Sequence, residues 1–513
     1  MAQRGGEVAA KRTKLSSGDA GGVGEDRLSA LPDDLLVLIL LRLDTAAAAV
    51  RTSAFSRRWS RVWALLPELR FDPAPDGRAL RGILDAPEAA ALRRISVTTE
   101  GARPESAAAW LPAAARRLSG DLVYHNIAAP PMSYEEEEKE AGEAVQLPCF
   151  EKATTIELNM GFLGLALPPQ GVFARLTGIS LRCVRFRSPC ELGDVVSWPR
   201  CPLLKKLEVH DSRGLDNLVF IDSKSLLLIK LKALRSLRKL ILVTPHLQEL
   251  SVIRIFLHLD EDPSEPVANI SAPQLESLEW NEVYDPQHVH LGNLGQVQWL
   301  ITNYFVVYGS PRSRIVNRHC LRLLQRFQAL YSLVLTLVYK QDINDLQCLM
   351  GDIAMLPQIR FLHLTVLNQG HAFGASSFHL LRMCTDLREL SFGLHANGNM
   401  DAQSTCPSGC ICDQPVSWKT EALVLNHLKR VEIFDMRGAE HEVTFVKQLF
   451  IWATVLKKLR IRFNYRVSES KAREFCRALA GSSRPETSVE FYMYDVSTSS
   501  TYLLEPEGHG TGF

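Results

Sequence analysis

The sequence predicts an α/β fold: a small all-helical unit followed by a long solenoid of repeats, built as a curved parallel sheet with helical or irregular returns. Two observations lead to this expectation. Near the N-terminus, within residues 26–72, a proline and two aspartates precede an unbroken apolar run. From about Ala153 onward, apolar residues recur with a spacing of three and then two positions.

The first predicted helix opens at Pro32. Proline is tolerated at the first helical position because the backbone N–H is not needed there, and Asp33 and Asp34 place negative charge in the first turn. The apolar residues Leu35–Leu41 follow without a break. This run is too short to span a bilayer, and a helix that is apolar all round must be buried on more than one side.

Two further short helices are predicted behind the first. Thr45 can cap a second helix over Ala46–Val50. Ser56 can cap a third helix, which carries Trp59 and Trp63. Three short helices in about forty residues are too small a unit to cover this much apolar surface alone. We therefore expect a permanent partner protein.

This stretch resembles the F-box of plant F-box proteins. The resemblance rests on Leu31–Leu36, Ile39–Leu43 and Thr52–Trp59, with Leu-Pro opening the first helix and Ser-Arg-Arg-Trp opening the third. It implies docking onto a Skp-type adaptor within a cullin–RING ubiquitin ligase. The family's usual Leu-Pro-Thr-Lys and acidic residue are replaced by Leu43–Ala47, which bears on docking strength.

The resemblance also implies which residues contact or shape the adaptor surface, although the sequence does not separate these two roles. The expected residues are Leu31, Pro32, Leu35, Ile39, Leu43, Val50, Arg58 and Trp59.

The composition is that of an ordinary soluble globular protein. Of 513 residues, 46% are hydrophobic and 22% charged, so two or three folded units are expected unless a repeat array takes most of the length. A net charge of +1 gives no overall attraction to nucleic acid or anionic membranes. We see no secretory signal and no transmembrane run. The 11 cysteines, an odd number, fit reduced thiols in the nucleus or cytoplasm.

Segments outside the regular pattern have their own expectations. Residues 1–25 and 496–513 are predicted to be tails, the first disordered and carrying a minimal nuclear-import motif at Lys11–Lys14. Residues 73–148 are predicted to form irregular early repeats. They include an acidic loop at 133–146, which is expected to be solvated, with contact to a basic substrate as the alternative.

A repeat of the leucine-rich class is predicted over residues 149–405. Its pattern, Leu-x-x-Leu-x-Leu, gives one strand per unit, and stacking of the units supplies a continuous core. Intervals of 28 or 29 residues between final positions recur five times, whereas intervals of 33, 10 and 41 break the regularity. The interval of 10 indicates adjacent short strands or one false match. The copies end at Leu158 (a weaker one), Leu181, Val209, Leu242, Val252, Trp280, Leu335, Leu364, Phe392, Ile433 and Ile461.

The segment 406–495 carries a second resemblance. Cys406–Asp413 and Leu425–Ile433 are similar to the C-terminal region of grass F-box/leucine-rich-repeat proteins, close to the FBD module. The segment is expected to supply the last two repeats, a closing helix at Glu469–Leu479 and a strand at Val489–Tyr494. Such a cap is what a solenoid needs at its end.

Cys406, Cys410 and Cys412 are weak candidates for a metal site. Structural zinc takes four Cys or His ligands, usually as two close pairs on rigid turns, and this spacing matches no RING or finger pattern. We therefore expect no metal and no cofactor, and interpret the thiols as reduced loop cysteines or a local redox pair. A fourth ligand would have to come from Cys384, His395 or His427.

Motifs for catalysis are not found. The sequence contains no P-loop, dinucleotide fingerprint, His-Glu-x-x-His helix or nucleophile elbow. Basic clusters at Arg57–Arg61, Lys230–Lys239 and Lys457–Arg462 are interpreted as solvated strand edges, and neither nucleic acid nor membrane is expected as a partner.

These expectations predict a non-catalytic substrate receptor of a Skp–cullin–F-box ubiquitin ligase. The F-box would dock the adaptor, and variable strand positions would bind a protein target of unknown identity. One alternative is a repeat-domain interaction scaffold that does not assemble into a ligase. A weaker one is a receptor that also senses a small molecule, which a concave polar pocket with convergent Arg and His side chains would favour.

Overall fold

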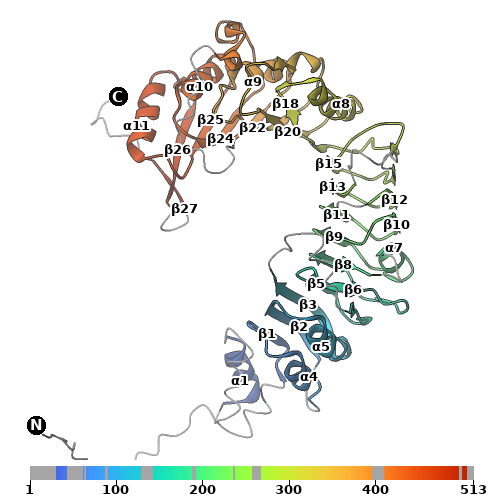
Figure 1. Ribbon diagram of the computed structural model, residues 1–513. Helices are drawn as coiled ribbons and strands as arrows, with labels where there is room; N and C mark the ends of the chain where they lie inside the picture. The colour runs from blue at the N-terminus through green and yellow to red at the C-terminus, as the bar shows by residue number, and fades with distance from the viewer. Residues whose placement is uncertain are drawn as a thin grey trace, which may run out of the picture.

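The computed structural model shows a long arch whose inner side is lined by strands (Figure 1). Helices cover its outer side toward both ends. The predicted α/β fold with a parallel solenoid is therefore confirmed. No helix within the described residues has the length and apolarity to cross a membrane. The described residues are 31–42, 62, 65–86, 91–128, 143–187, 192–234, 237–256, 267–395, 410–495 and 500–504.

One sheet follows the inner side of the arch, and each strand pairs in parallel with the next until the last pair, β26 and β27, which is antiparallel. A short strand, β18 (Phe305–Val306), pairs with the upper part of β20. The strands, in order across the sheet, are β1 (Glu68–Phe71), β2 (Leu92–Glu100), β3 (Leu118–Ile127), β5 (Thr155–Asn159), β7 (Gly178–Arg182), β9 (Lys206–His210), β11 (Leu228–Lys232), β13 (Glu249–Ile253), β15 (Ser277–Asn281), β17 (Trp299–Thr302), β20 (Ser332–Val338), β22 (Phe361–Leu367), β23 (Glu389–Leu394), β24 (Arg430–Met436), β25 (Lys458–Phe463), β26 (Ser488–Asp495) and β27 (Ser500–Leu503).

Each strand of this sheet separates core from surface by simple alternation. In β25, Leu459, Ile461 and Phe463 are buried, whereas the three basic residues between them stay partly exposed on the concave side. The alternation arises because successive side chains of a strand point to opposite faces. The buried residues of neighbouring units stack into one continuous core, as the leucine pattern predicts.

The predicted interval of 10 residues reflects two walls of the solenoid. Leu242 lies in β12 (Lys239–Val243), whereas Val252 lies in β13 of the inner sheet. β12 belongs to a second parallel sheet with β10 (Leu218–Asp222), β14 (Val267–Ser271) and β16 (Val289–Leu291). Both pattern matches are therefore genuine strands, adjacent in sequence but on opposite sides of the core.

Two repeats were missed by the pattern search. Leu231 of β11 ends a copy 22 residues after Val209 and 21 residues before Val252. β17 ends in Thr302 where an apolar residue was sought. The predicted interval of 33 thus compared strands of different walls, since spacing alone does not say which wall a strand joins.

Residues 68–127 are more regular than predicted. β1, α4 (Gly77–Leu84), β2, α5 (Pro104–Arg117) and β3 form alternating strands and helices. The buried face of α5 is largely alanine around Trp110, so it carries no leucine periodicity. The expectation of irregular early repeats is corrected for this part, whereas most of the acidic loop, residues 129–142, lies outside the described residues.

The outer wall is built from strands in the middle of the arch and from helices toward its ends. Repeats of 21 or 22 residues return through the second sheet, and repeats near 28 residues have room for helices. The predicted closing helix is found as α11 with the expected bounds. The outer elements are β4 (Val145–Gln146), β6 (Gly164–Ala166), β8 (Arg185–Phe186), α7 (Leu192–Val196), β19 (Tyr308–Gly309), α8 (Pro311–Gln325), β21 (Gln347–Cys348), η3 (Met350–Asp352), α9 (Gly374–Leu381), η4 (Ile411–Asp413), η5 (Val416–Lys419), α10 (Glu440–Trp452) and α11 (Glu469–Leu479).

Candidate functional sites on the N-terminal helix and the concave sheet

The N-terminal helix, α1 (Asp33–Leu40), begins as the sequence indicates. Pro32 is its N-cap residue, and the Pro32 carbonyl accepts hydrogen bonds from the N–H groups of Leu35 at 3.1 Å and Leu36 at 3.2 Å. Asp33 and Asp34 lie in the first turn, where negative charge interacts favourably with the helix dipole.

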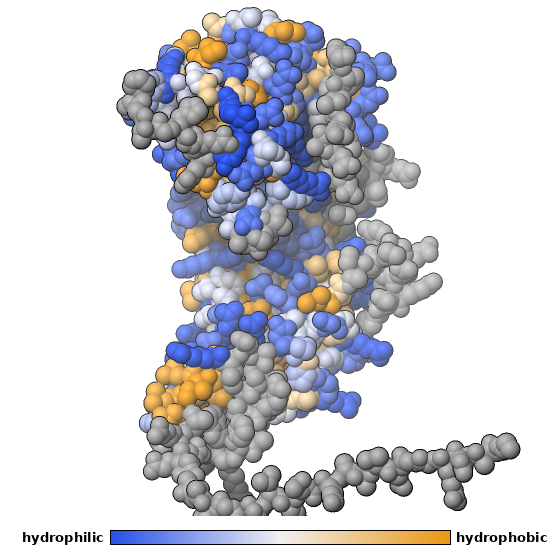
Figure 2. Space-filling model, turned by 90° about the vertical axis from the view of Figure 1, so that its left-hand side faces the viewer, coloured by the Kyte–Doolittle hydropathy of each residue, from blue (hydrophilic) through white to orange (hydrophobic). Residues whose placement is uncertain are grey.

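This helix has one buried and one exposed apolar side. Leu36 and Leu40 are buried in the core. Leu35, Leu38 and Ile39 are 45%, 56% and 39% exposed, and their spacing places them on one face of the helix. We call these three residues the apolar face of α1. Figure 2 shows an apolar patch at the end of the molecule where α1 lies.

Of the residues expected at an adaptor surface, Leu35 and Ile39 lie on the apolar face of α1, and Pro32 is exposed at its start. Leu31 is half-buried and packs against the core. Leu38 was missed, although its position three residues after Leu35 was a sufficient signal. The other expected residues, Leu43, Val50, Arg58 and Trp59, lie outside the described residues, so their roles stay predictions.

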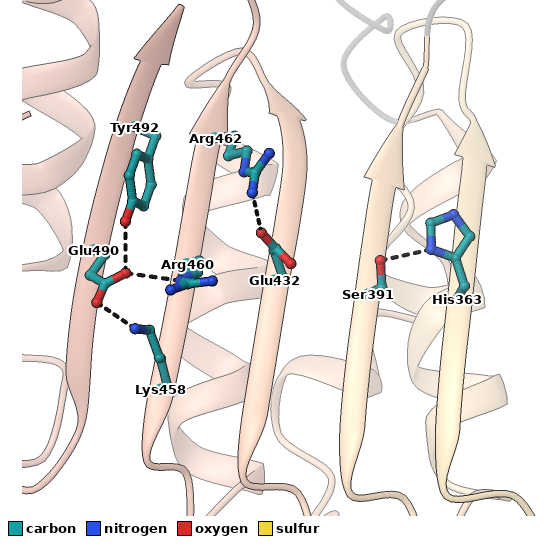
Figure 3. Close-up of polar contacts among 8 residues, drawn as sticks. All are labelled: His363, Ser391, Glu432, Lys458, Arg460, Arg462, Glu490 and Tyr492. Carbon is teal, nitrogen blue, oxygen red and sulfur yellow. Dashed lines mark hydrogen bonds and ion pairs between the residues drawn. The ribbon is translucent and has the colours of Figure 1, made fainter. Parts of the chain in front are cut away.

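A second candidate site is the concave face of the sheet near the C-terminal end. The parallel register places partly exposed side chains of neighbouring strands in rows across the sheet (Figure 3). One such row consists of His363, Ser391, Glu432, Arg460 and Glu490.

Glu490 is the centre of a polar network on this face. Its carboxylate pairs with Lys458 Nζ at 2.6 Å and accepts hydrogen bonds from Arg460 Nε and the Tyr492 hydroxyl, both at 2.9 Å. These donors, Lys458 foremost, lower the pKa of Glu490 to about 2, so the carboxylate is ionised at neutral pH. Figure 3 shows the donors converging on Glu490 from two adjacent strands.

Arg462 is held in the next row. Its guanidinium donates to Glu432 at 2.8 Å and lies over the rings of Phe434, at 5.1 Å, and Tyr492, at 6.0 Å. Cation–π contacts of this kind restrain an arginine without neutralising it. The acidic and basic partners are 30 residues apart in sequence, close to one repeat, so the repeat offset could have found them.

A cavity of about 690 Å³ opens beside Arg462. Its size lies in the range of small-molecule sites. His395 Nδ1 pairs with Asp435 at 3.0 Å in its wall. His363 Nδ1 is 2.7 Å from Ser391 Oγ, and burial lowers the pKa of His363, which favours the neutral ring. The lining residues are His363, Gly393, His395, Phe434, Asp435, Arg462, Phe463, Tyr465, Tyr494 and Thr501.

Metal-ligating side chains converge away from the concave face. His371, Cys410 and Cys412 each offer a ligand atom, and these atoms lie within 4.8 Å of one another. None of the three residues expected to supply a fourth ligand belongs to this group within the described residues, and Cys406 lies outside them. Sequence reasoning missed His371 because no spacing rule links it to Cys410, 39 residues later.

Comparison with known proteins places these features in a family context. The model of the F-box domain matches residues 28–71, and the model of the LRR repeats of FBD-associated F-box protein At5g56370 matches residues 107–294. The chain thus contains an F-box followed by leucine-rich repeats.

Three proteins of Arabidopsis thaliana illustrate the similarity. F-box/FBD/LRR-repeat protein At4g03220 is 26% identical over 494 residues, which cover 88% of this chain and 92% of that protein. F-box/FBD/LRR-repeat protein At3g49030 is 29% identical over 39% of this chain and 45% of its own length. F-box/FBD/LRR-repeat protein At5g53840 is 51% identical over 55 residues, 11% of this chain and 12% of that protein.

The match spans 45% of At3g49030 and 54% of F-box/LRR-repeat protein At4g15060, about half the length of these two relatives. Together the matches confirm the resemblance read from the sequence: this is a plant-type F-box/leucine-rich-repeat chain of the FBD-associated kind. The narrower resemblance to grass proteins stays a prediction.

Proposed function

We propose that this chain is the substrate-recognition subunit of a Skp–cullin–F-box ubiquitin ligase. The observation that carries the proposal is the apolar face of α1, which lies within the matched F-box at the very residues expected to dock an adaptor. Exposed apolar side chains gain about 25 cal/mol for each Å² removed from water, so a partner that covers Leu35, Leu38 and Ile39 binds favourably.

The repeat domain takes the role of target binding in this proposal. Its concave face presents side chains on rigid, paired strands, which is the usual way that a solenoid binds a protein. The chain itself is non-catalytic in this role. It holds the lysines of a target near a conjugating enzyme and so raises their effective concentration. We place this activity in the nucleus, the cytoplasm or both.

The test is co-purification of the full chain with a Skp-type adaptor. The variant Leu35→Glu/Ile39→Glu places two charges on the apolar face of α1 and is expected to weaken binding at least about a hundredfold, as expected when charged groups are buried without partners. The control Ile315→Glu/Ile451→Glu places the same charges on α8 and α10, at side chains that are 52% and 62% exposed, and should bind normally.

Binding of an adaptor and a cullin by the native chain, lost only in the first variant, supports the proposal. A native chain that is folded and monomeric in the presence of adaptor refutes it. The repeat-domain scaffold without a ligase would then be the better interpretation.

A second candidate function is sensing of a small molecule. The observation that favours it is the concave cavity, where Arg462 and two histidines converge beside the rings of Phe434, Tyr465 and Tyr494. A fragment screen by ligand-observed NMR tests this candidate with the native chain and Tyr465→Ala/Tyr494→Ala. Binding of a fragment that the variant abolishes supports it, and the lack of any such fragment contradicts it.

A further inference from the structure

Two loops that are far apart in the sequence bring soft metal ligands to one buried point. The thiols of Cys410 and Cys412 and a ring nitrogen of His371 lie within 4.8 Å of one another. Their residues are only 9%, 2% and 6% exposed. Thiolate and imidazole are the preferred ligands of Zn²⁺ in proteins. We propose that His371, Cys410 and Cys412 bind a zinc ion, independently of the function proposed above.

The spacing of the ligands fits a tetrahedral ion. Zinc lies about 2.3 Å from sulfur and about 2.0 Å from nitrogen, so two tetrahedral ligands of these types are about 3.5 Å apart. Cys410 Sγ and His371 Nδ1 are 3.6 Å apart. A thiol–imidazole hydrogen bond has a similar length, and this is the competing interpretation that the experiment below must separate.

The imidazole of His371 is oriented for metal binding. Its Nε2 lies 3.1 Å from the carbonyl oxygen of Gln341, which can only accept, so Nε2 carries the proton and the lone pair is on Nδ1. Histidine ligands of zinc are typically fixed by such a hydrogen bond from the second nitrogen. Asn368 donates to the His371 carbonyl at 2.7 Å, and the ring of Tyr339 stacks on the imidazole.

The loop that carries the two cysteines is also held in place. Burial raises the pKa of Tyr308, so its hydroxyl stays protonated and donates to the carbonyl of Ile411 at 3.0 Å, across 103 residues of sequence. Asp413 accepts from Trp418 Nε1 at 3.0 Å and pairs with Lys419. The thiols therefore sit on a short, anchored turn, as structural zinc sites require.

Charge balance is compatible with burial of the ion. Two thiolates neutralise the two positive charges of zinc, and the neutral imidazole adds no further charge. The ion would tie the turn after β22 to the loop of the longest repeat interval, between Phe392 and Ile433. The fourth tetrahedral position is filled by water or by another donor.

The experiment measures metal in the full chain, purified through a tag without histidines from zinc-supplemented cells. Elemental analysis is expected to give about one zinc per chain. The variant Cys410→Ser/Cys412→Ser should fall to background. Cys384→Ser is the matched control, since Cys384 is an equally buried thiol that donates to the Leu380 carbonyl at 3.3 Å outside the group, and it should keep the metal.

Cobalt exchange gives a readout that needs no variant. Replacement of zinc by Co²⁺ in the native chain should produce thiolate-to-cobalt charge-transfer bands and the strong visible absorption of a tetrahedral ion. A native chain without zinc and without these bands overturns the proposal. So does a Cys410–Cys412 disulfide found by mass spectrometry of the freshly purified chain.

Discussion

A methyl group at position 374 would collide with a buried tryptophan. Gly374 is the first residue of α9, and a Cβ atom there would overlap the six-membered ring of Trp418 and lie 2.7 Å from its Cε2. The indole is hydrogen-bonded to Asp413 and packs edge-on against Trp452, with ring centroids 6.2 Å apart. It cannot move aside without losing these contacts.

The expected cost of Gly374→Ala follows from this packing. Extra carbon in a closely packed core destabilises by about 1–3 kcal/mol. The collision involves three atoms of a rigid ring, so we expect the upper part of this range, about 2–3 kcal/mol. The loss should be local, because each unit of a solenoid contacts mainly its neighbours.

Native-state hydrogen exchange is the suitable assay, since a long repeat array need not unfold as one unit. In Gly374→Ala, the amides of residues 410–419 should exchange at least about thirtyfold faster, which corresponds to about 2 kcal/mol of local opening. The control is Gly82→Ala in α4, where a Cβ atom meets nothing within 4 Å. Alanine there should slow exchange in α4, because glycine destabilises a helix interior by about 0.5–1 kcal/mol.

Unchanged exchange at residues 410–419 in Gly374→Ala would refute this account of the packing. Faster exchange spread evenly over all repeats would refute the claim that the loss is local. Neither result depends on whether the loop also binds zinc, provided that both proteins are compared in the same metal-free or zinc-containing buffer.

Two further predictions concern carboxylates. Because the folded-state pKa of Glu490 is depressed from 4.5 to about 2, its stabilisation is complete above about pH 4.5 and is lost as the pH falls toward 2. Glu490→Gln should remove this acid-dependent part, about 1 kcal/mol given the exposure of its partners, when hydrogen exchange of β25 and β26 is compared across that range; equal acid profiles would contradict it. Glu442 is buried and accepts from the backbone N–H groups of residues 437–439 at 2.8–3.1 Å. Glu442→Ala should cost about 3–5 kcal/mol in the local stability of α10 and Glu442→Gln clearly less, measured by the same exchange, and equal losses would argue against these hydrogen bonds.

Much of the fold was predictable because its determinants are local or periodic. The proline and aspartates that open α1 act within one helical turn. The leucine spacing records the stacking of units, so most strands of the inner sheet were located from it. It failed in α5, whose buried face is mainly alanine, and at Leu242, whose pattern is satisfied by the outer wall.

The sites were less predictable because they depend on contacts between distant residues. The apolar face of α1 could be anticipated from helical spacing alone. The partner of Cys410, His371, lies 39 residues earlier on another loop, and nothing in the spacing of either loop refers to the other. The concave network is intermediate, since its charged partners are separated by about one repeat.

The two candidate surfaces differ in what a partner must displace. The apolar face of α1 exposes carbon to water, so a partner that covers it replaces only water and gains from every Å² buried. On the concave face, Glu490, Arg460 and Arg462 already have partners within the sheet, so a charged ligand must compete with existing ion pairs. Such competition yields little net affinity but penalises a wrong charge pattern. The physics therefore assigns constant attachment to α1 and discrimination among partners to the concave sheet.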